Sequence, residues 1–127
     1  PNPADEKARG KALRDKKRNL FLLVVPEDRA IDLKALRDRL GAAGNLSFGS
    51  PELLMEALGV IPGAVTPFAL INDRQKRVSV FLDKRMLEFD PLNYHPLSNA
   101  LTTAIKPRDL LKFIESCGHT PRIVDLG

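Results

Sequence analysis

The apolar positions of this chain fall into short runs whose spacing predicts strands separated by helices. Residues 20–25 (Leu-Phe-Leu-Leu-Val-Val) form an unbroken apolar run, typical of a strand that is buried on both faces of a sheet. Residues 68–71 form a shorter run that ends at a polar pair, which predicts a second buried strand. Residues 78–83 alternate in character, and we expect them to pair with 68–71 as a hairpin. A final strand is expected over 122–126.

Three segments carry the start and stop signals of helices. The segment 32–41 begins with a capping aspartate, 50–59 begins with Ser-Pro, and both end with a glycine. The third, 107–118, begins with a proline and ends with a glycine, and 84–89 predicts a short helical turn. Because strands and helices interleave irregularly, the sequence predicts one α+β (mixed α/β) domain over residues 1–127.

The first eighteen residues are charged and poor in apolar side chains, so they fit no element well. They contain seven Lys or Arg residues against three Asp or Glu residues. We expect a solvated tail or turn here, and the alternative is a basic surface that RNA approaches. The net charge of the whole chain, +4, permits an anionic partner but indicates one only weakly.

Cysteine and histidine usage narrows the class of protein. One cysteine, Cys117, excludes an internal disulfide, and His95 and His119 do not have the spacing of a metal site. We therefore expect no metal and no cofactor. No apolar run approaches the ~18 residues of a membrane span, and the charged N-terminus is unlike a signal peptide. We expect a cytoplasmic domain without a membrane partner.

Gly63 to Pro67 is the first segment that could bind a ligand. The Pro62-Gly63 pair marks a turn, because proline fixes φ and glycine enters left-handed space cheaply. A loop pinned by Gly63 and Pro67 can point bare N–H groups at a carbonyl, carboxylate or phosphate oxygen. An ordinary connection between elements is the alternative, and spacing alone favours it.

A second segment, Asn93 to Thr103, gathers amide, imidazole and hydroxyl groups within eleven residues. His95 lies between Tyr94 and Pro96, and the restricted backbone before a proline holds its imidazole in orientation. Such an imidazole can donate to a phosphate or sugar hydroxyl, or position a water. A structural hydrogen bond is the alternative, and for His119 we expect that structural role. The chain carries no Gly-x-Ser-x-Gly elbow, Walker loop or dinucleotide fingerprint.

Several segments recur in an order that resembles one known family. They are 44–52 (Gly-Asn-Leu-Ser-Phe-Gly-Ser-Pro-Glu), 60–73, 93–103 and 118–125 (Gly-His-Thr-Pro-Arg-Ile-Val-Asp). Together they resemble the YbaK-like aminoacyl-tRNA deacylases, and most closely the freestanding editing proteins related to the insertion domain of bacterial prolyl-tRNA synthetases. The resemblance runs from about Leu20 to the C-terminus, and it implies a curled mixed sheet with flanking helices.

The resemblance also implies a trans-editing hydrolase, in which water attacks the ester joining a mischarged amino acid, most closely alanine, to tRNA(Pro). By position, Gly63 begins the family's Gly-x-x-x-Pro loop and His95 matches its imidazole, so these two are the implied catalytic residues. The implied partners are the acceptor end of tRNA(Pro) and prolyl-tRNA synthetase. Core packing is the alternative role for the last two of the implied substrate-binding residues, which are Ala64, Val65, Thr66, Pro67, Asn93, Thr103, Leu46 and Phe48.

One part of the family pattern is not found. Family members carry Gly-Gly-His-x-Lys-Asn-Leu-Phe-Leu before the first strand, and its lysine is thought to bind the tRNA end or assist hydrolysis. Here residues 10–14 run directly into Asp15, and the lysine cannot be assigned to Lys11, Lys16 or Lys17. We therefore expect that N-terminal elements and a loop near 14–15 are absent, or that the lysine is lacking. The alternatives are a non-catalytic tRNA-binding or synthetase-associated module, or a deacylase of cysteinyl- or seryl-tRNA.

Overall fold

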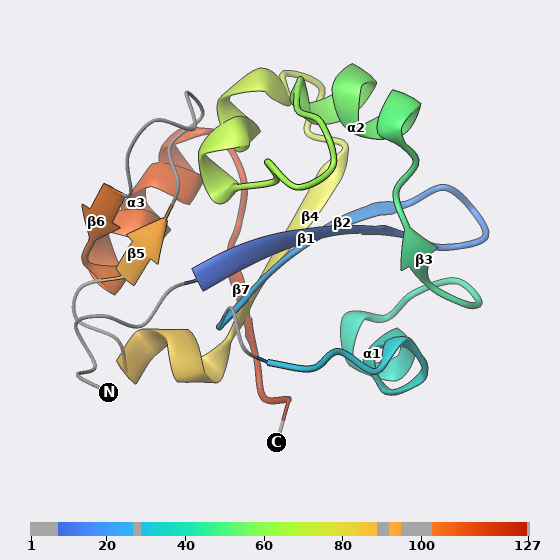
Figure 1. Cartoon of the computed structure of the whole chain (residues 1–127), viewed down its shortest axis with the longest axis horizontal. Coiled ribbons are helices and arrows are strands. Elements are labelled where there is room, and N and C mark those ends of the chain that lie inside the picture. Colours follow the sequence, from blue (N-terminus) through green and yellow to red (C-terminus); the bar gives the residue numbers. More distant parts are fainter. Residues whose placement is uncertain (1–7, 27–28, 89–91, 95–102, 127) are drawn as a thin grey trace.

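A mixed β-sheet forms the centre of the molecule in the computed structural model, which describes residues 8–26, 29–88, 92–94 and 103–126 (Figure 1). Its strands are β1 (Ala8–Arg14), β2 (Leu20–Pro26), β3 (Ser47–Phe48), β4 (Val78–Asp83) and β7 (Arg122–Val124). Within the described residues they pair in the order β3-β1-β2-β4-β7. β1 is antiparallel to β2 and β3, whereas β4 is parallel to β2 and β7. β5 (Leu92–Tyr94) and β6 (Thr103–Ile105) form a separate antiparallel pair.

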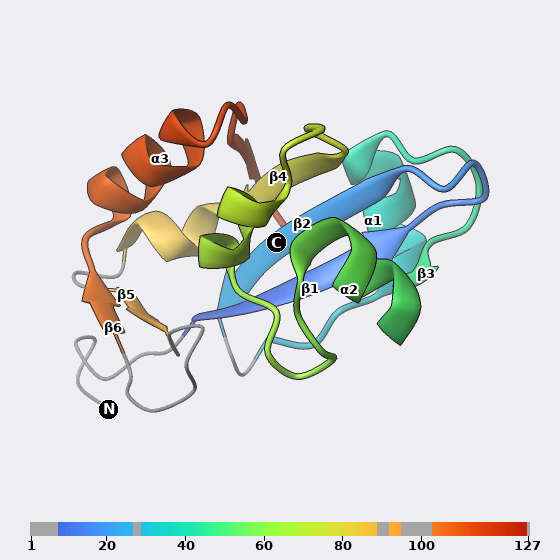
Figure 2. The same cartoon turned by 90° about the horizontal axis from the view of Figure 1, so that it is seen from above.

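Helices cover both faces of the sheet (Figures 1 and 2). α1 (Leu33–Leu40) lies on one face; α2 (Pro51–Leu58), α3 (Pro107–Ser116) and the 3-10 helix η2 (Pro67–Asn72) lie on the other. A second 3-10 helix, η3 (Lys84–Glu88), follows β4. Leu22 of β2 packs with the α2 side and Leu23 with the α1 side, so β2 is buried on both faces as predicted. The α+β class is confirmed.

The ends of the α-helices follow the predicted local chemistry. The Asp32 carboxylate accepts the N–H of Lys34 to begin α1, and the Ser50 hydroxyl accepts the N–H of Leu53 to begin α2. Both helices end at a glycine in the left-handed conformation, and α3 begins at Pro107. No helix in the described ranges has the length and apolar character needed to cross a membrane.

The expectation of a solvated tail over the first eighteen residues is wrong for residues 8–14, which form β1 inside the sheet. β1 pairs with β2 along its whole length, from Ala8 opposite Pro26 to Arg14 opposite Leu20. Its apolar pattern is weak because the positions toward α2 and η2 are small, Gly10 and Ala12. Backbone pairing and close packing, which propensity does not register, therefore place this charged segment in the core.

A buried carboxylate closes the turn between β1 and β2. Asp15 is 1% exposed, and its oxygens accept the N–H groups of Lys17, Asn19 and Ala43 at 2.8–2.9 Å, as well as the Asn19 side-chain amide. Burial by itself raises the pKa of the Asp15 carboxyl, but the hydrogen bonds, that from Ala43 first, outweigh it and lower the pKa below its ordinary 3.8.

Replacing Asp15 with asparagine is expected to destabilise the fold by about 2 kcal/mol, because an amide turns one donor toward N–H groups that need an acceptor. Since the folded pKa is depressed, this stability is present above pH 3.8 and is lost as pH falls toward the folded value. Urea unfolding at pH 7 and at pH 3 checks both points. The gap between wild type and Asp15→Asn should narrow at pH 3, and a gap independent of pH would contradict this account.

Two further expectations about the strands are wrong. Residues 68–71 lie in η2, where the Thr66 hydroxyl accepts the N–H of Phe68 and Pro67 occupies the first turn. Periodicity cannot tell so short an apolar run from a helical turn. Consequently β4 is not one arm of a hairpin but a parallel neighbour of β2 and β7.

Candidate active site

A pocket of about 280 Å³ opens beside the N-terminal half of β1. β3 pairs only with Leu13 and Arg14, so it leaves the edge of β1 uncovered before these residues. The pocket is lined by β1 from Arg9 to Ala12, by the end of β3, by α2 and by the loop that precedes η2. β1 therefore meets, at one exposed strand edge, three consecutive segments that lie more than thirty residues further along the chain.

Gly10 is the point at which the loop meets the strand. A Cβ at this position would lie 2.9 Å from the carbonyl oxygen of Val65 and 3.3 Å from the amide nitrogen of Thr66. The two backbones are therefore in a contact that only glycine permits. Ala12, two residues along β1, accepts a hydrogen bond from the Gly49 N–H at 3.0 Å. Backbone groups of a strand alternate in direction, so the N–H and C=O of Gly10 point to this same edge.

The predicted Gly63–Pro67 loop forms the opposite wall of the pocket. Gly63 has φ +88°, and it lines the pocket together with Val65. The Ala64 N–H donates to Ile61 within the turn, and Thr66 is buried as the cap of η2. In the part of the chain that the structure describes, no hydrogen bond takes the N–H groups of Gly63 and Val65. The Thr66 N–H is likewise without a hydrogen bond among the described residues, but Gly63 and Val65 are the two that line the pocket, so their N–H groups can serve a ligand there.

Lys11 supplies a cation beside this loop. Lys11 is half-buried in β1, and it is one of the residues that line the pocket with Gly63. Burial, and secondarily the positive charge of Arg9, lower the pKa of the Lys11 ammonium below its ordinary 10.5. An ammonium next to backbone donors makes a site for a carbonyl or carboxylate oxygen.

Leu46 and Phe48, both predicted to line the substrate pocket, lie in different parts of the structure. Phe48 lines the pocket and is 57% exposed, an unusual degree for a large apolar side chain. Leu46 lies instead in the core cluster under α1, which is the alternative role expected for it. Leu46 precedes β3, so the alternation of side chains along a strand does not require it to share a face with Phe48.

Asn93 and Thr103 lie on the paired strands β5 and β6, and β5 contacts β1. Figure 2 shows this small sheet beside the start of β1. His95 lies outside the described residues. His119 has the structural place expected for it, since its Nε2 is 3.3 Å from the buried Asp73 carboxylate. The described residues contain no cluster of side chains that could hold a metal ion.

Lys11 is the pocket residue that the sequence left unassigned. The family stretch was sought as a separate segment before the first strand, but residues 10–14 are themselves the strand that precedes β2. Lys16 and Lys17 lie in the turn at the far end of β1, and neither lines the pocket. The lysine next to a glycine and followed by small and apolar residues was the signal that could have identified it.

The chain matches known proteins along most of its length. A family profile described as an aminoacyl-tRNA editing domain matches residues 3–113. The chain is 42% identical over 114 residues to the prolyl-tRNA synthetase associated domain-containing protein 1 of Danio rerio. The aligned region covers 88% of this chain and 61% of that relative. It is 36% identical over 115 residues to the prolyl-tRNA editing protein ProX of Acetoanaerobium sticklandii, spanning 90% of this chain and 70% of that one.

A crystal structure of a candidate trans-editing enzyme for prolyl tRNA synthetase superposes with a TM-score of 0.69. The match covers 94% of this chain and 70% of that chain at 18% identity, which establishes likeness of fold alone. The family profile covers most of the sequence, and the resemblance inferred from the motifs is confirmed. The chain therefore belongs to the aminoacyl-tRNA editing domain family.

Proposed function

We propose that this domain hydrolyses the ester bond of a mischarged tRNA(Pro), with alanyl-tRNA(Pro) as the preferred substrate. The observation that carries the proposal is the meeting of the Lys11 ammonium, the Gly10 strand edge and the Gly63–Val65 loop in one pocket. A cation and fixed N–H groups suit the oxygen of an ester carbonyl as it gains negative charge. Family membership supports an aminoacyl-tRNA as the carrier of that ester.

In the proposed reaction a water oxygen adds to the ester carbonyl carbon, and the former carbonyl oxygen becomes an oxyanion. Lys11 and the N–H groups of Gly63 and Val65 stabilise that charge. The intermediate collapses by breaking the bond to the ribose oxygen, which takes up a proton as amino acid and tRNA separate. The neighbouring ribose hydroxyl of the substrate assists the water, and His95 remains the candidate for positioning it.

The walls of the pocket support a preference for a small amino acid. Ala12, Leu54 and Val65 provide apolar surface in the pocket that Lys11 also lines. An apolar pocket gains only ~1–3 kcal/mol per methylene, so it cannot favour alanine over proline by attraction. Steric exclusion of the larger proline ring is the better device, because packed walls resist expansion.

An aminoacyl-tRNA substrate also suggests a role for Phe48 at the edge of the pocket and a candidate protein partner. The exposed face of Phe48 suits stacking with the terminal base of the tRNA, a contact that tolerates any base. Prolyl-tRNA synthetase would supply the mischarged substrate, which places the reaction in the cytoplasm and makes that enzyme a candidate partner. A non-catalytic tRNA-binding module is the second candidate, but Lys11 in the pocket removes the main reason for it.

The test is hydrolysis of a panel of charged tRNA(Pro) species, carrying alanine, cysteine, serine or proline, by the full chain. Alanyl-tRNA(Pro) should be hydrolysed fastest, and prolyl-tRNA(Pro) at least about tenfold more slowly, because even one methylene changes rates by that factor. A faster rate on cysteinyl- or seryl-tRNA would reassign the amino acid. Intact alanyl-tRNA(Pro) at high enzyme concentration would refute hydrolysis, and retained tRNA binding would then favour the binding module.

A further inference from the structure

The turn between β1 and β2 carries a cluster of cations that the pocket does not use. Arg14, Lys16, Lys17 and Arg18, here called the hairpin cations, lie within five positions, and the last three are exposed. The one acid among them, Asp15, is buried and directs its carboxylate at N–H groups of the turn. Within the described ranges no ion pair neutralises any hairpin cation.

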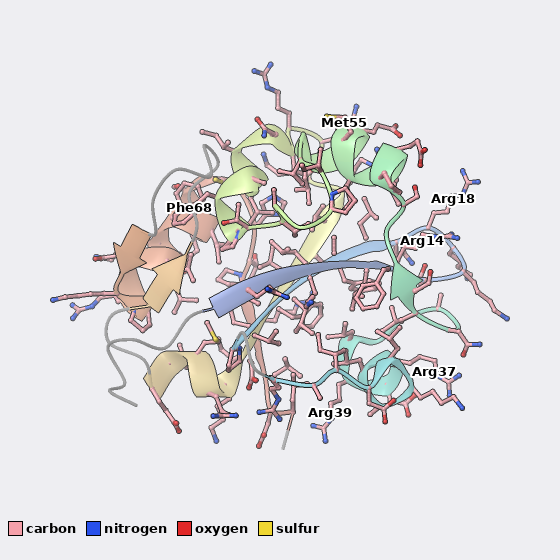
Figure 3. The ribbon with its side chains drawn as sticks, viewed as in Figure 1. Arg14, Arg18, Arg37, Arg39, Met55 and Phe68 are labelled. Carbon is pink, nitrogen blue, oxygen red and sulfur yellow. The ribbon has the colours of Figure 1, made fainter. Side chains whose placement is uncertain are left out.

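Two of these side chains also shape a surface hollow. Arg14 and Arg18 line a space of about 290 Å³ beside the start of α2, and both project from the β1–β2 end of the molecule (Figure 3). Glu52 and Glu56 lie in the same wall, but Glu56 pairs with Arg77 at 3.2 Å. Two arginines against one remaining carboxylate leave the hollow net positive. Arginine suits a phosphate, because its planar group donates two parallel hydrogen bonds.

The hollow adjoins the pocket on the same side of the sheet. Gly49 lines the pocket and Ser50, the next residue, lines the hollow. Along β1, Lys11 and Arg14 are three residues apart, which is ~10 Å at the rise of a strand. An RNA strand whose 3′ end enters the pocket therefore passes the hairpin cations within its last few nucleotides.

The backbone at Arg18 adds an independent observation. Arg18 has φ +64°, the left-handed conformation that closes a three-residue hairpin turn and that glycine adopts without cost. An arginine here costs conformational free energy and places its charge in solvent at the tip of the turn. Strain at an exposed charged residue points to a binding role.

We propose that the hairpin cations bind the phosphate backbone of the acceptor strand while its aminoacylated 3′ end occupies the pocket. The identity of the RNA rests on the proposed function, but the surface itself does not. Phosphate contacts of this kind position the nucleic acid without reading its sequence. They strengthen binding of the RNA, and they leave the orientation of the ester and the chemical step to the pocket.

The most informative variant is Arg18→Gly, which removes the positive charge and also relieves the backbone strain of a non-glycine residue at positive φ. Its thermal midpoint should equal or exceed that of the wild type, so weaker binding cannot be attributed to unfolding. Lys17→Gln tests a second cation, and Lys112→Gln on α3 is the matched control, because Lys112 is exposed at the opposite end of the sheet. Glu52→Gln should act in the opposite direction and tighten binding.

Binding of uncharged tRNA(Pro) is measured at several salt concentrations, and hydrolysis of the alanyl form is measured beside it. Arg18→Gly and Lys17→Gln should each weaken Kd several-fold and reduce the slope of log K against log salt by about one, with kcat unchanged. Unchanged slopes, equal losses in Lys112→Gln, or no binding by the wild type would overturn the inference. If the wild type hydrolyses alanyl-tRNA(Pro) but the variants keep the wild-type salt slope, the proposed function is supported and the proposed phosphate-binding surface is refuted. If the variants lose salt-dependent binding but the wild type hydrolyses no substrate, the phosphate-binding surface is supported and the proposed function is refuted.

Discussion

Replacing Lys11 with alanine is expected to lower kcat for alanyl-tRNA(Pro) by about 100- to 1,000-fold, the usual loss when one donor to an oxyanion is removed. Lys11 and Arg9 are the cations among the described residues that line the pocket with Gly63 and Val65, so the loss of Lys11 removes one donor to the developing charge. The half-buried side chain belongs to neither of the two apolar cores that flank the sheet, and alanine suits a strand position beside Ala12. The thermal midpoint should therefore shift by only a few degrees.

The lowered pKa of Lys11 adds a test that a structural role would not satisfy. Burial first, and then Arg9, make the ammonium lose its proton at a lower pH than a free lysine would. The catalysed rate, corrected for spontaneous ester hydrolysis, should fall as pH rises through that pKa. An arginine keeps its charge over this pH range, so the rate of Lys11→Arg should no longer fall as pH rises, even if this variant is slower than the wild type at every pH. A normal rate in folded Lys11→Ala would remove Lys11 from the mechanism.

What the sequence could predict is what depends on neighbouring residues. Asp32, Ser50 and the glycines after α1 and α2 set the ends of these helices through hydrogen bonds and φ values that lie within a few positions. The burial of β2 followed for the same reason, since the longer apolar run of residues 20–25 is typical of a strand covered on both faces. The α+β class needed no more than these local signals.

What the sequence could not predict depends on contacts between distant segments. β1 pairs with β2 in the sheet, and Gly10 lets the Val65 backbone approach it, but nothing within residues 8–14 reveals either partner. The sequence therefore could not show that Lys11 lies in the same pocket as the Gly63–Pro67 loop. Likewise, whether residues 68–71 form a strand or a 3-10 turn depends on the Thr66 cap and on β2 already having β4 as its neighbour. The pocket is a product of tertiary contacts, although each of its residues was visible.

Replacing Gly10 with alanine is expected to destabilise the fold by about 1–3 kcal/mol, as overpacking does, and to reduce hydrolysis about 100-fold per folded molecule. The added methyl would lie 2.9 Å from the Val65 oxygen, and this atom belongs to backbone that cannot rotate away. β1 is held by β2, and the loop is held by η2, so the strain has to separate the two walls of the pocket. A displacement of about 1 Å suffices for the loss of rate.

Gly41→Ala is the control that separates this displacement from simple instability. Gly41 has φ +68° with no atom within 4 Å of an added Cβ, and it lies at the end of α1, away from the pocket. Alanine there costs about 1 kcal/mol through conformation alone and should leave kcat unchanged. Urea unfolding and single-turnover hydrolysis of both variants make the comparison. If Gly10→Ala loses stability but keeps the wild-type rate per folded molecule, contact between β1 and the Gly63–Pro67 loop shapes the fold without positioning the donors, and catalysis has to be sought elsewhere in the pocket.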